Sequence, residues 1–244
     1  MNLLLVAPDE IVAGIATLAD DRAVHLRTVL KVAPGQRIRA GIARGGLGTA
    51  EILDDDGRAI RVRLEVGAPS VPMPVELVLA IPRPKVLSRT LEIAASFAVE
   101  RIQLTNAWRV DKSYLDSPRL APAALARAAW LGATQGATTH LPEIAVHRRL
   151  MGLLEGRYAT GTRLIAHPDA PPLERSYPPA PRAGAGHGAP VTVAIGPEGG
   201  WIQREVDTFV ERGFVPVSLG TPILRVEAAV AALLGQLALL ARMA

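Results

Sequence analysis

Two glycine-containing turns are the segments best suited to bind a small molecule. The first lies in Val191-Thr-Val-Ala-Ile-Gly-Pro-Glu-Gly-Gly200, where an apolar run ends in a turn rich in glycine. Glycine has no side chain and reaches positive φ, so the backbone amides of such a turn can approach a ligand closely. The spacing matches neither a Walker A motif nor G-x-G-x-x-G. From spacing alone, an ordinary turn and a ligand-binding loop are equally open.

The second turn lies in Val217-Ser-Leu-Gly-Thr-Pro-Ile-Leu-Arg-Val-Glu-Ala-Ala229. Here a strand is expected to end near Gly220, and a helix to begin with Arg225 and Glu227. A charge at a helix start usually caps the helix or forms a surface ion pair. Ligands of open α/β sheets, however, bind at the carboxyl ends of strands, where His167 is also expected. The two turns and His167 are therefore candidates for one site.

The elements that must position these turns alternate between strands and helices after residue 74. Apolar runs predict parallel strands at 75–81, 102–105, 164–166, 191–195 and 215–218, and helices at 85–97, 122–132, 203–212 and near the end of the chain. The Pro- and Gly-rich stretch 170–190 predicts an irregular or mobile loop. The apolar stretch 228–243 is shorter than a bilayer span and is interrupted by Gly235, Gln236 and Arg242, which favours a buried helix over a membrane anchor.

The first 67 residues have a different pattern, typical of a small β-barrel. Short apolar runs predict strands at 3–6, 37–42, 48–52 and 60–66, with one helix at 21–30. Residues 68–74, rich in proline, predict a stiff linker. The chain therefore divides into an expected barrel and an α/β part.

The amino-acid composition excludes several kinds of chemical site. The 244 residues are 49% hydrophobic, enough for a sizeable core, and they include no cysteine, which excludes disulfides, thiolate metal sites and cysteine nucleophiles. The histidines are scattered, so no metal site is expected. The net charge of +4 is compatible with nucleic-acid binding or with an ordinary solvated surface. The amino terminus lacks a basic leader and carries Asp9 and Glu10, so we expect a cytoplasmic protein.

These motifs resemble one known family. The run Ile195-Gly-Pro-Glu-Gly-Gly200, followed by Leu219-Gly220 and Ile223-Leu-Arg-Val-Glu-Ala-Ala229, is similar to the carboxyl-terminal signature of the RsmE family of 16S ribosomal RNA uridine-N3 methyltransferases. The segment His25-Leu-Arg-Thr-Val-Leu-Lys31 with Pro34-Gly35 resembles the PUA-like RNA-binding domain of that family. Together the two matches span nearly the whole chain.

The resemblance implies a fold, a cofactor and partners. It implies an α/β fold in which a PUA-like barrel at 1–72 precedes a SPOUT-type, trefoil-knotted parallel sheet at 73–244. It further implies a homodimer that uses S-adenosyl-L-methionine to methylate 16S rRNA, within the small ribosomal subunit. The residues it places against the methyl donor are Ala166, His167, Ile195, Gly196, Gly200, Leu219, Gly220, Ile223 and Leu224.

Methylation of N3 requires that the imide proton leaves and that charge on the uracil carbonyls is stabilised. Arg225 is our candidate for the electrostatic role. Glu198 or Glu227 is the candidate proton acceptor, directly or through water, although either carboxylate could instead cap a helix or orient Arg225.

RNA contacts are expected from basic and aromatic side chains. Arg27 and Lys31, one turn apart on the expected helix at 21–30, are candidates to touch phosphates together. The candidates near the active site are Arg83, Lys85 and Arg109. Trp108 or Tyr114 could stack on an extruded base, but for Trp108 core packing is the favoured interpretation. An apolar stripe is assigned to the core or to a dimer interface: Leu91, Ala94, Ala95 and Ala98.

Several positions depart from the family pattern and leave alternatives open. Thr134 and Thr138 stand where the family usually has Glu and Arg, and Leu224-Arg-Val-Glu-Ala-Ala229 lacks two threonines. The segment from Asn106 to Tyr114 also differs from the usual Ser-Glu-Arg-Ser. One alternative is another SPOUT reaction, on transfer RNA or a ribose hydroxyl. The other is a non-catalytic RNA-binding factor in ribosome assembly.

Overall fold

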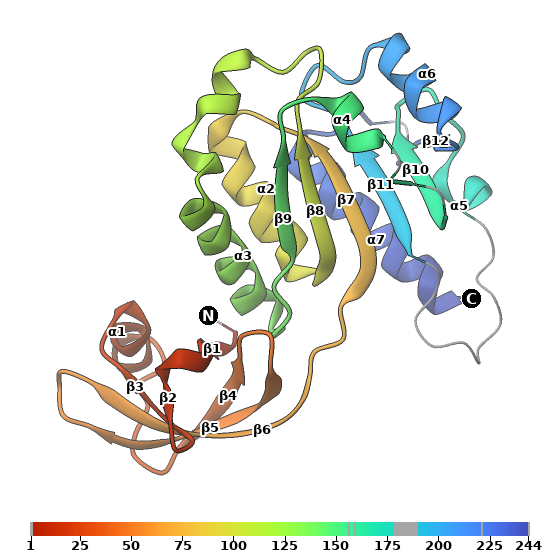
Figure 1. The fold of residues 1–244 in the computed structure, drawn as a ribbon. Helices are drawn as coiled ribbons and strands as arrows, with labels where there is room; N and C mark the ends of the chain where they lie inside the picture. The colour runs from red at the N-terminus through yellow and green to blue at the C-terminus, as the bar shows by residue number, and fades with distance from the viewer. Residues whose placement is uncertain (1, 156, 159, 178–189, 221, 244) are drawn as a thin grey trace.

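The computed structural model describes residues 2–155, 157–158, 160–177, 190–220 and 222–243. Its strands form two six-stranded sheets that follow one another along the chain (Figure 1). The first sheet is built from residues up to Pro69, and the second begins at Met73. The α/β fold with an amino-terminal β-rich part is therefore confirmed.

The first sheet has the strand order β1-β4-β5-β6-β3-β2. In β6, Ile60 and Val62 are buried while Arg61 and Arg63 are exposed, as the alternation in the sequence predicts. The elements of this part are β1 (Leu4–Val6), η1 (Pro8–Glu10), β2 (Ile11–Val12), β3 (Ile15–Leu18), α1 (Asp21–Thr28), β4 (Arg37–Ile42), β5 (Gly46–Asp55) and β6 (Ile60–Pro69).

The second sheet is parallel throughout, in the order β12-β10-β11-β7-β8-β9. Its strands are β7 (Met73–Ala80), β8 (Val99–Thr105), β9 (Glu143–His147), β10 (Thr162–Ala166), β11 (Val191–Ile195) and β12 (Val215–Val217). The helical elements are α2 (Pro84–Ser96), η2 (Lys112–Asp116), η3 (Pro118–Leu120), α3 (Pro122–Gly136), α4 (Leu150–Leu154), α5 (Leu173–Ser176), α6 (Gln203–Glu211) and α7 (Val226–Met243).

The expected elements differ from the observed ones mainly where segments are short. Strands β2, β3 and β9 and helices α4 and α5 were not predicted, because runs of two to five residues carry too little periodicity. The linker is shorter than expected, since pairing extends β6 to Pro69 and starts β7 at Met73. Helix α5 lies within the predicted loop at 170–190, and positions 178–189 of that loop lie outside the described residues.

Helices α2 and α3 pack unusually closely. A Cβ at Gly132 or Gly136 would collide with the α2 backbone, at Glu92 and Ser96, so glycine is needed for this approach. The stripe that includes Leu91, Ala94 and Ala95 is fully buried here, and it therefore belongs to the core of the single chain.

Helix α7 contributes Val226, Val230, Leu233, Leu234 and Leu237 to the main hydrophobic core. By length and mean hydropathy it is the one helix among the described residues that could span a bilayer. One face of α7 packs against α2, as predicted for a buried helix, but only 28% of its residues are buried, and Leu239 and Met243 near its end are exposed.

The barrel is fixed to the amino ends of the second sheet. Leu3 and Leu5 pack against Ala133 of α3. The backbone N–H groups of Ser70 and Thr139 each donate to the other residue's hydroxyl, at 3.0 and 2.9 Å. Gly41 lies so close to Thr139 that a side chain there would collide with it. The barrel therefore has a defined position at the amino ends of the strands of the second sheet.

Candidate functional site

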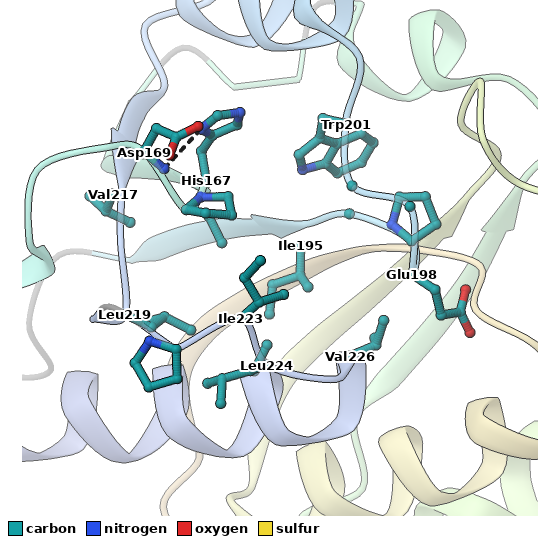
Figure 2. Close-up of a pocket in the computed structure, with 18 of the residues that line it drawn as sticks. His167, Asp169, Ile195, Glu198, Trp201, Val217, Leu219, Ile223, Leu224 and Val226 are labelled. Atoms are coloured by element: carbon teal, nitrogen blue, oxygen red, sulfur yellow. Dashed lines mark hydrogen bonds between the residues drawn. The ribbon is translucent and has the colours of Figure 1, made fainter.

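A cavity of about 380 Å³ opens at the carboxyl ends of the three neighbouring strands β12, β10 and β11 (Figure 2). This volume lies within the range of small-molecule sites. All nine residues predicted to contact a methyl donor line it: Ala166, His167, Ile195, Gly196, Gly200, Leu219, Gly220, Ile223 and Leu224. Three segments far apart in the sequence thus form one pocket.

The loop after β10 is held by backbone bonds to its neighbour. The His167 N–H donates to the carbonyl of Val217 at 2.9 Å, which continues the parallel pairing one residue beyond the strand. The Asp169 N–H donates to Nδ1 of His167 at 3.4 Å, and Figure 2 shows this contact as a dashed line. The imidazole is therefore oriented by its own loop.

The loop after β11 is a tight turn in which two glycines have different tasks. The Gly200 N–H donates to the Pro197 carbonyl at 2.8 Å, and the φ of Gly200 is +71°, a conformation that favours glycine. A Cβ at Gly196 would lie 3.1–3.2 Å from Trp201. Gly196 therefore makes room for the indole of Trp201.

Trp201 was missed by the sequence reasoning, although it directly follows the glycine-rich run. Its side chain is only 5% exposed, and its ring packs edge-to-face on Phe209 with centroids 5.1 Å apart. Its buried Nε1 has no hydrogen-bond partner within the described residues. A buried donor without an acceptor is unfavourable. An acceptor on a bound molecule would relieve this cost.

The loop after β12 forms the third wall. Gly220 has φ +119°, and the Leu219 carbonyl accepts a hydrogen bond from Nε2 of Gln236 in α7 at 3.3 Å. Ile223 is 87% exposed, so a large apolar side chain stands at the rim of the pocket. Apolar walls with backbone polar groups between them suit a ligand that combines an aromatic base with a polar tail.

The three candidate catalytic residues occupy different positions. Glu198 lines the pocket, but its Oε1 accepts a hydrogen bond from the Arg83 N–H at 2.9 Å, and Figure 2 shows the carboxylate turned away from the other labelled side chains. Arg225 is exposed, and Glu227 is half-buried in the first turn of α7. Neither lines the pocket, although Leu224 and Val226 beside them do.

The prediction that Arg27 and Lys31 lie one turn apart on the same helix is wrong. Helix α1 ends at Thr28, and Lys31 has φ +49°, so the chain has already turned before Pro34. Arg27 instead pairs with Asp55 through two nitrogens, with Nε–Oδ2 at 2.8 Å and Nη2–Oδ1 at 2.7 Å. Phosphate binding by these two residues stays a prediction.

The basic candidates of the second sheet gather near the pocket. Arg83 and Lys85 are exposed at the start of α2, after β7. Arg109 lines the pocket and donates through Nη1 to the Gly199 carbonyl. The core position favoured for its neighbour Trp108 is wrong, because this side chain is exposed.

Two residues in the middle of the chain that differ from the family pattern lie away from the pocket. Thr134 and Thr138 are buried at the end of α3, the helix that packs on α2 and meets the barrel. They are absent from the pocket lining. Within the described residues, no group of three or more His, Asp or Glu is placed to hold a metal ion.

Comparisons with known proteins decide the family. A family model described as RNA methyltransferase domain matches residues 69–238. The ribosomal RNA small subunit methyltransferase E of Treponema pallidum is 30% identical over 95% of this chain and 88% of its own length. This chain belongs to that family of RNA methyltransferases. A second member, ribosomal RNA small subunit methyltransferase E 1 of Borreliella burgdorferi, is 26% identical over 94% of both chains.

A solved structure of the same family supports the fold. The ribosomal RNA small subunit methyltransferase E from Neisseria gonorrhoeae, bound to S-adenosyl methionine, superimposes with a TM-score of 0.76. It is 23% identical, and the match covers 98% of each chain. The superposition supports the fold alone, and the family model with the relative from Treponema pallidum confirms the family resemblance. The knot and the roles of single residues stay predictions.

Proposed function

We propose that this chain transfers the methyl group of S-adenosyl-L-methionine to N3 of a uridine in 16S rRNA, in the cytoplasm. The observation that carries the proposal is the convergence of all nine expected donor-binding residues on one pocket at three strand ends. Family membership supports an rRNA substrate, and the choice of uridine N3 rests on the resemblance of the motifs.

The pocket residues fit this methyl donor, whose sulfonium supplies an activated methyl group. Ile195, Leu219 and Val226 offer an apolar surface for the adenine. The Nε1–H of Trp201, for which the described residues provide no acceptor, would donate to a polar atom of the donor. Gly200 and Gly220 line the pocket and have no side chain of their own to cover their backbone groups.

The imide proton and the developing charge are assigned to residues at the rim. The Arg225 guanidinium, exposed beside the pocket-lining Leu224, would stabilise charge on a uracil carbonyl through its planar pair of donors. Glu198 already accepts a hydrogen bond from Arg83, so we assign it to positioning the loop. Glu227 is then our candidate to accept the proton, directly or through water.

The proposal includes a homodimer. The barrel is seated at the amino ends of β7, β8 and β9, whereas the pocket lies at carboxyl ends. A strand of five to eight residues is about 17–26 Å long, so the barrel of the same chain lies far from the methyl donor. In a dimer, the partner's barrel could hold the RNA nearer to the pocket. We propose residues 1–72 and 73–244 as the two domains, with the second one knotted.

The alternatives differ in how far the structure supports them. A non-catalytic assembly factor was suggested by Thr134 and Thr138, but these residues do not line the pocket, so they give no reason to doubt donor binding. Methylation of transfer RNA or of a ribose hydroxyl would use the same pocket and differs only in the acceptor.

The acceptor is tested by incubating the protein with isotope-labelled S-adenosylmethionine and small ribosomal subunits from cells lacking its gene. Transfer RNA serves as the parallel substrate, and Arg225→Ala as the control enzyme. We expect labelled N3-methyluridine, found by mass spectrometry of nucleosides, only with the small subunit. Label in transfer RNA or in a ribose-methylated nucleoside would contradict the proposal, as would no transfer at all.

A further inference from the structure

The indole of Trp108 is exposed to solvent and does not belong to the hydrophobic core. Its side chain is 78% exposed, whereas Trp201 is buried and Trp130 of α3 packs against the cluster that contains Leu3 and Leu5 of the barrel. Large aromatic side chains gain stability from burial, so a tryptophan held in water calls for another explanation.

The backbone around Trp108 is anchored by hydrogen bonding and burial despite this exposure. The Val110 N–H donates to the Ala107 carbonyl at 3.1 Å, which closes a four-residue turn with Trp108 and Arg109 at its tip. Ala107 and Val110 at the two ends of the turn are buried. The indole is therefore presented from an anchored turn.

The tip of this turn is also bound to α6 and to one wall of the pocket. The Trp108 N–H donates to Oε1 of Glu205 at 2.8 Å, and Oε2 of Glu205 accepts the Ile202 N–H at 3.0 Å. Arg109 donates to the Gly199 carbonyl of the loop that follows β11. These contacts hold Trp108 beside the mouth of the pocket.

The surrounding edge of the sheet carries exposed cations. Basic side chains follow the carboxyl ends of β7, β8 and β9: Arg83, Lys85, Arg109, Lys112, Arg148 and Arg149. Among the acidic groups nearby, Asp116 pairs with Arg148 at 2.8 Å, and Asp111 accepts from Ser113. This charge favours a polyanion next to the indole.

We propose that Trp108 is a platform on which an unpaired base of single-stranded RNA stacks at the mouth of the pocket. Aromatic side chains bind unstacked bases in this way, while neighbouring cations hold the phosphates. The inference rests on the proposed function, because it assumes an RNA substrate at this pocket. It gives a role to the Asn106–Tyr114 segment, which is one of the segments where the sequence departs from the family pattern.

The test compares Trp108→Ala and Trp108→Phe with the wild type, using a fluorescent single-stranded oligouridylate and a duplex RNA of equal length. Loss of one base stack weakens binding by roughly 5- to 100-fold, so we expect that loss for Trp108→Ala with the single strand. Trp108→Phe should retain most of the affinity. The salt dependence should stay unchanged, because no phosphate contact is removed.

Val210→Ala is the matched control, since Val210 is also exposed, at 47%, on α6. We expect wild-type affinity for it. The platform assignment is wrong if Trp108→Ala binds the single strand normally, or if it loses affinity for single-stranded and duplex RNA equally. Because oligonucleotide binding needs no methyl transfer, this result is separate from failure of the proposed function, which would appear as a wild-type protein without methyltransferase activity.

Discussion

Glu198 and Arg83, 115 residues apart in the sequence, are joined by a hydrogen bond of 2.9 Å from the Arg83 N–H to Oε1 of Glu198. Arg83 is the residue that precedes α2, and Glu198 lies in the turn after β11. A carboxylate at this end of a helix is also favoured by the helix dipole. The bond therefore ties a pocket wall to the start of a core helix.

This bond predicts the behaviour of two Glu198 variants. Glu198→Gln keeps an oxygen acceptor, so its single-turnover methylation rate should stay close to that of the wild type. Glu198→Ala removes the acceptor and should lower the free energy of unfolding by about 1 kcal/mol. If Glu198→Gln instead slows the reaction by about 10² or more, Glu198 is the general base and our assignment is wrong.

Arg225 should matter for chemistry more than for donor binding. Arg225→Lys keeps the charge but loses the planar pair of donors, so the rate at saturating cofactor should fall by about 10² or more. Affinity for the cofactor should change little. Raising the pH toward the ionisation of uridine should partly restore the rate. A lysine variant with the wild-type single-turnover rate on small subunits would remove Arg225 from the catalytic assignment.

RNA docking by the barrel should depend on Lys31 more than on Arg27. Arg27 is already paired with Asp55, whereas Lys31 is exposed beyond the end of α1. Lys31→Ala should reduce the slope of RNA affinity against salt by about one, the loss of one phosphate contact. Arg27→Ala should change the slope less. An unchanged slope in the double variant would show that this part of the barrel does not dock RNA.

Acid should weaken the barrel through Glu10 and Asp20. Hydrogen bonds from the Arg22 side chain hold the pKa of Glu10 below its ordinary 4.5 and that of Asp20 below its ordinary 3.8. The unfolded chain therefore binds more protons than the folded chain in acid. The stability these carboxylates contribute is complete above about pH 4.5 and is lost as pH falls through the lowered values.

Urea unfolding between pH 7 and pH 3 measures this effect. Glu10→Gln should be less stable than the wild type at pH 7, and the difference should shrink at pH 3. Asp9→Asn, at the neighbouring exposed position, is the control and should follow the wild-type curve. A Glu10→Gln deficit that is independent of pH would contradict the role of the ion pair.

Most elements with a clear apolar pattern could be predicted from the sequence, and several short elements could not. The bounds of β4 and β11 were predicted without error, and helix α2 was predicted within one residue at each end. Strand β9 was missed because its pairing with β8 depends on the sheet already formed, not on its own five residues.

The glycine-containing turns and His167 could be named as candidates from the sequence pattern, whereas the nine residues of the pocket lining were predicted from the resemblance to the family. Trp201 could not be predicted, since its place in the wall depends on packing against Phe209 and on the space left by Gly196. The exposure of Trp108 could not be predicted from the sequence either. A tryptophan in a sequence is usually buried, and only the anchored turn shows that this one is not.

The account depends most on the methyl donor binding at the three strand ends, and isothermal titration with S-adenosylmethionine tests this directly. Gly200 in the pocket and Gly57 in the barrel have φ of +71° and +82°, and a Cβ at either would meet nothing within 4 Å. Valine at the two positions therefore imposes similar backbone strain. We predict that the wild type and Gly57→Val bind one donor per chain, and that folded Gly200→Val does not. No binding by the wild type, or normal binding by Gly200→Val, would contradict the account.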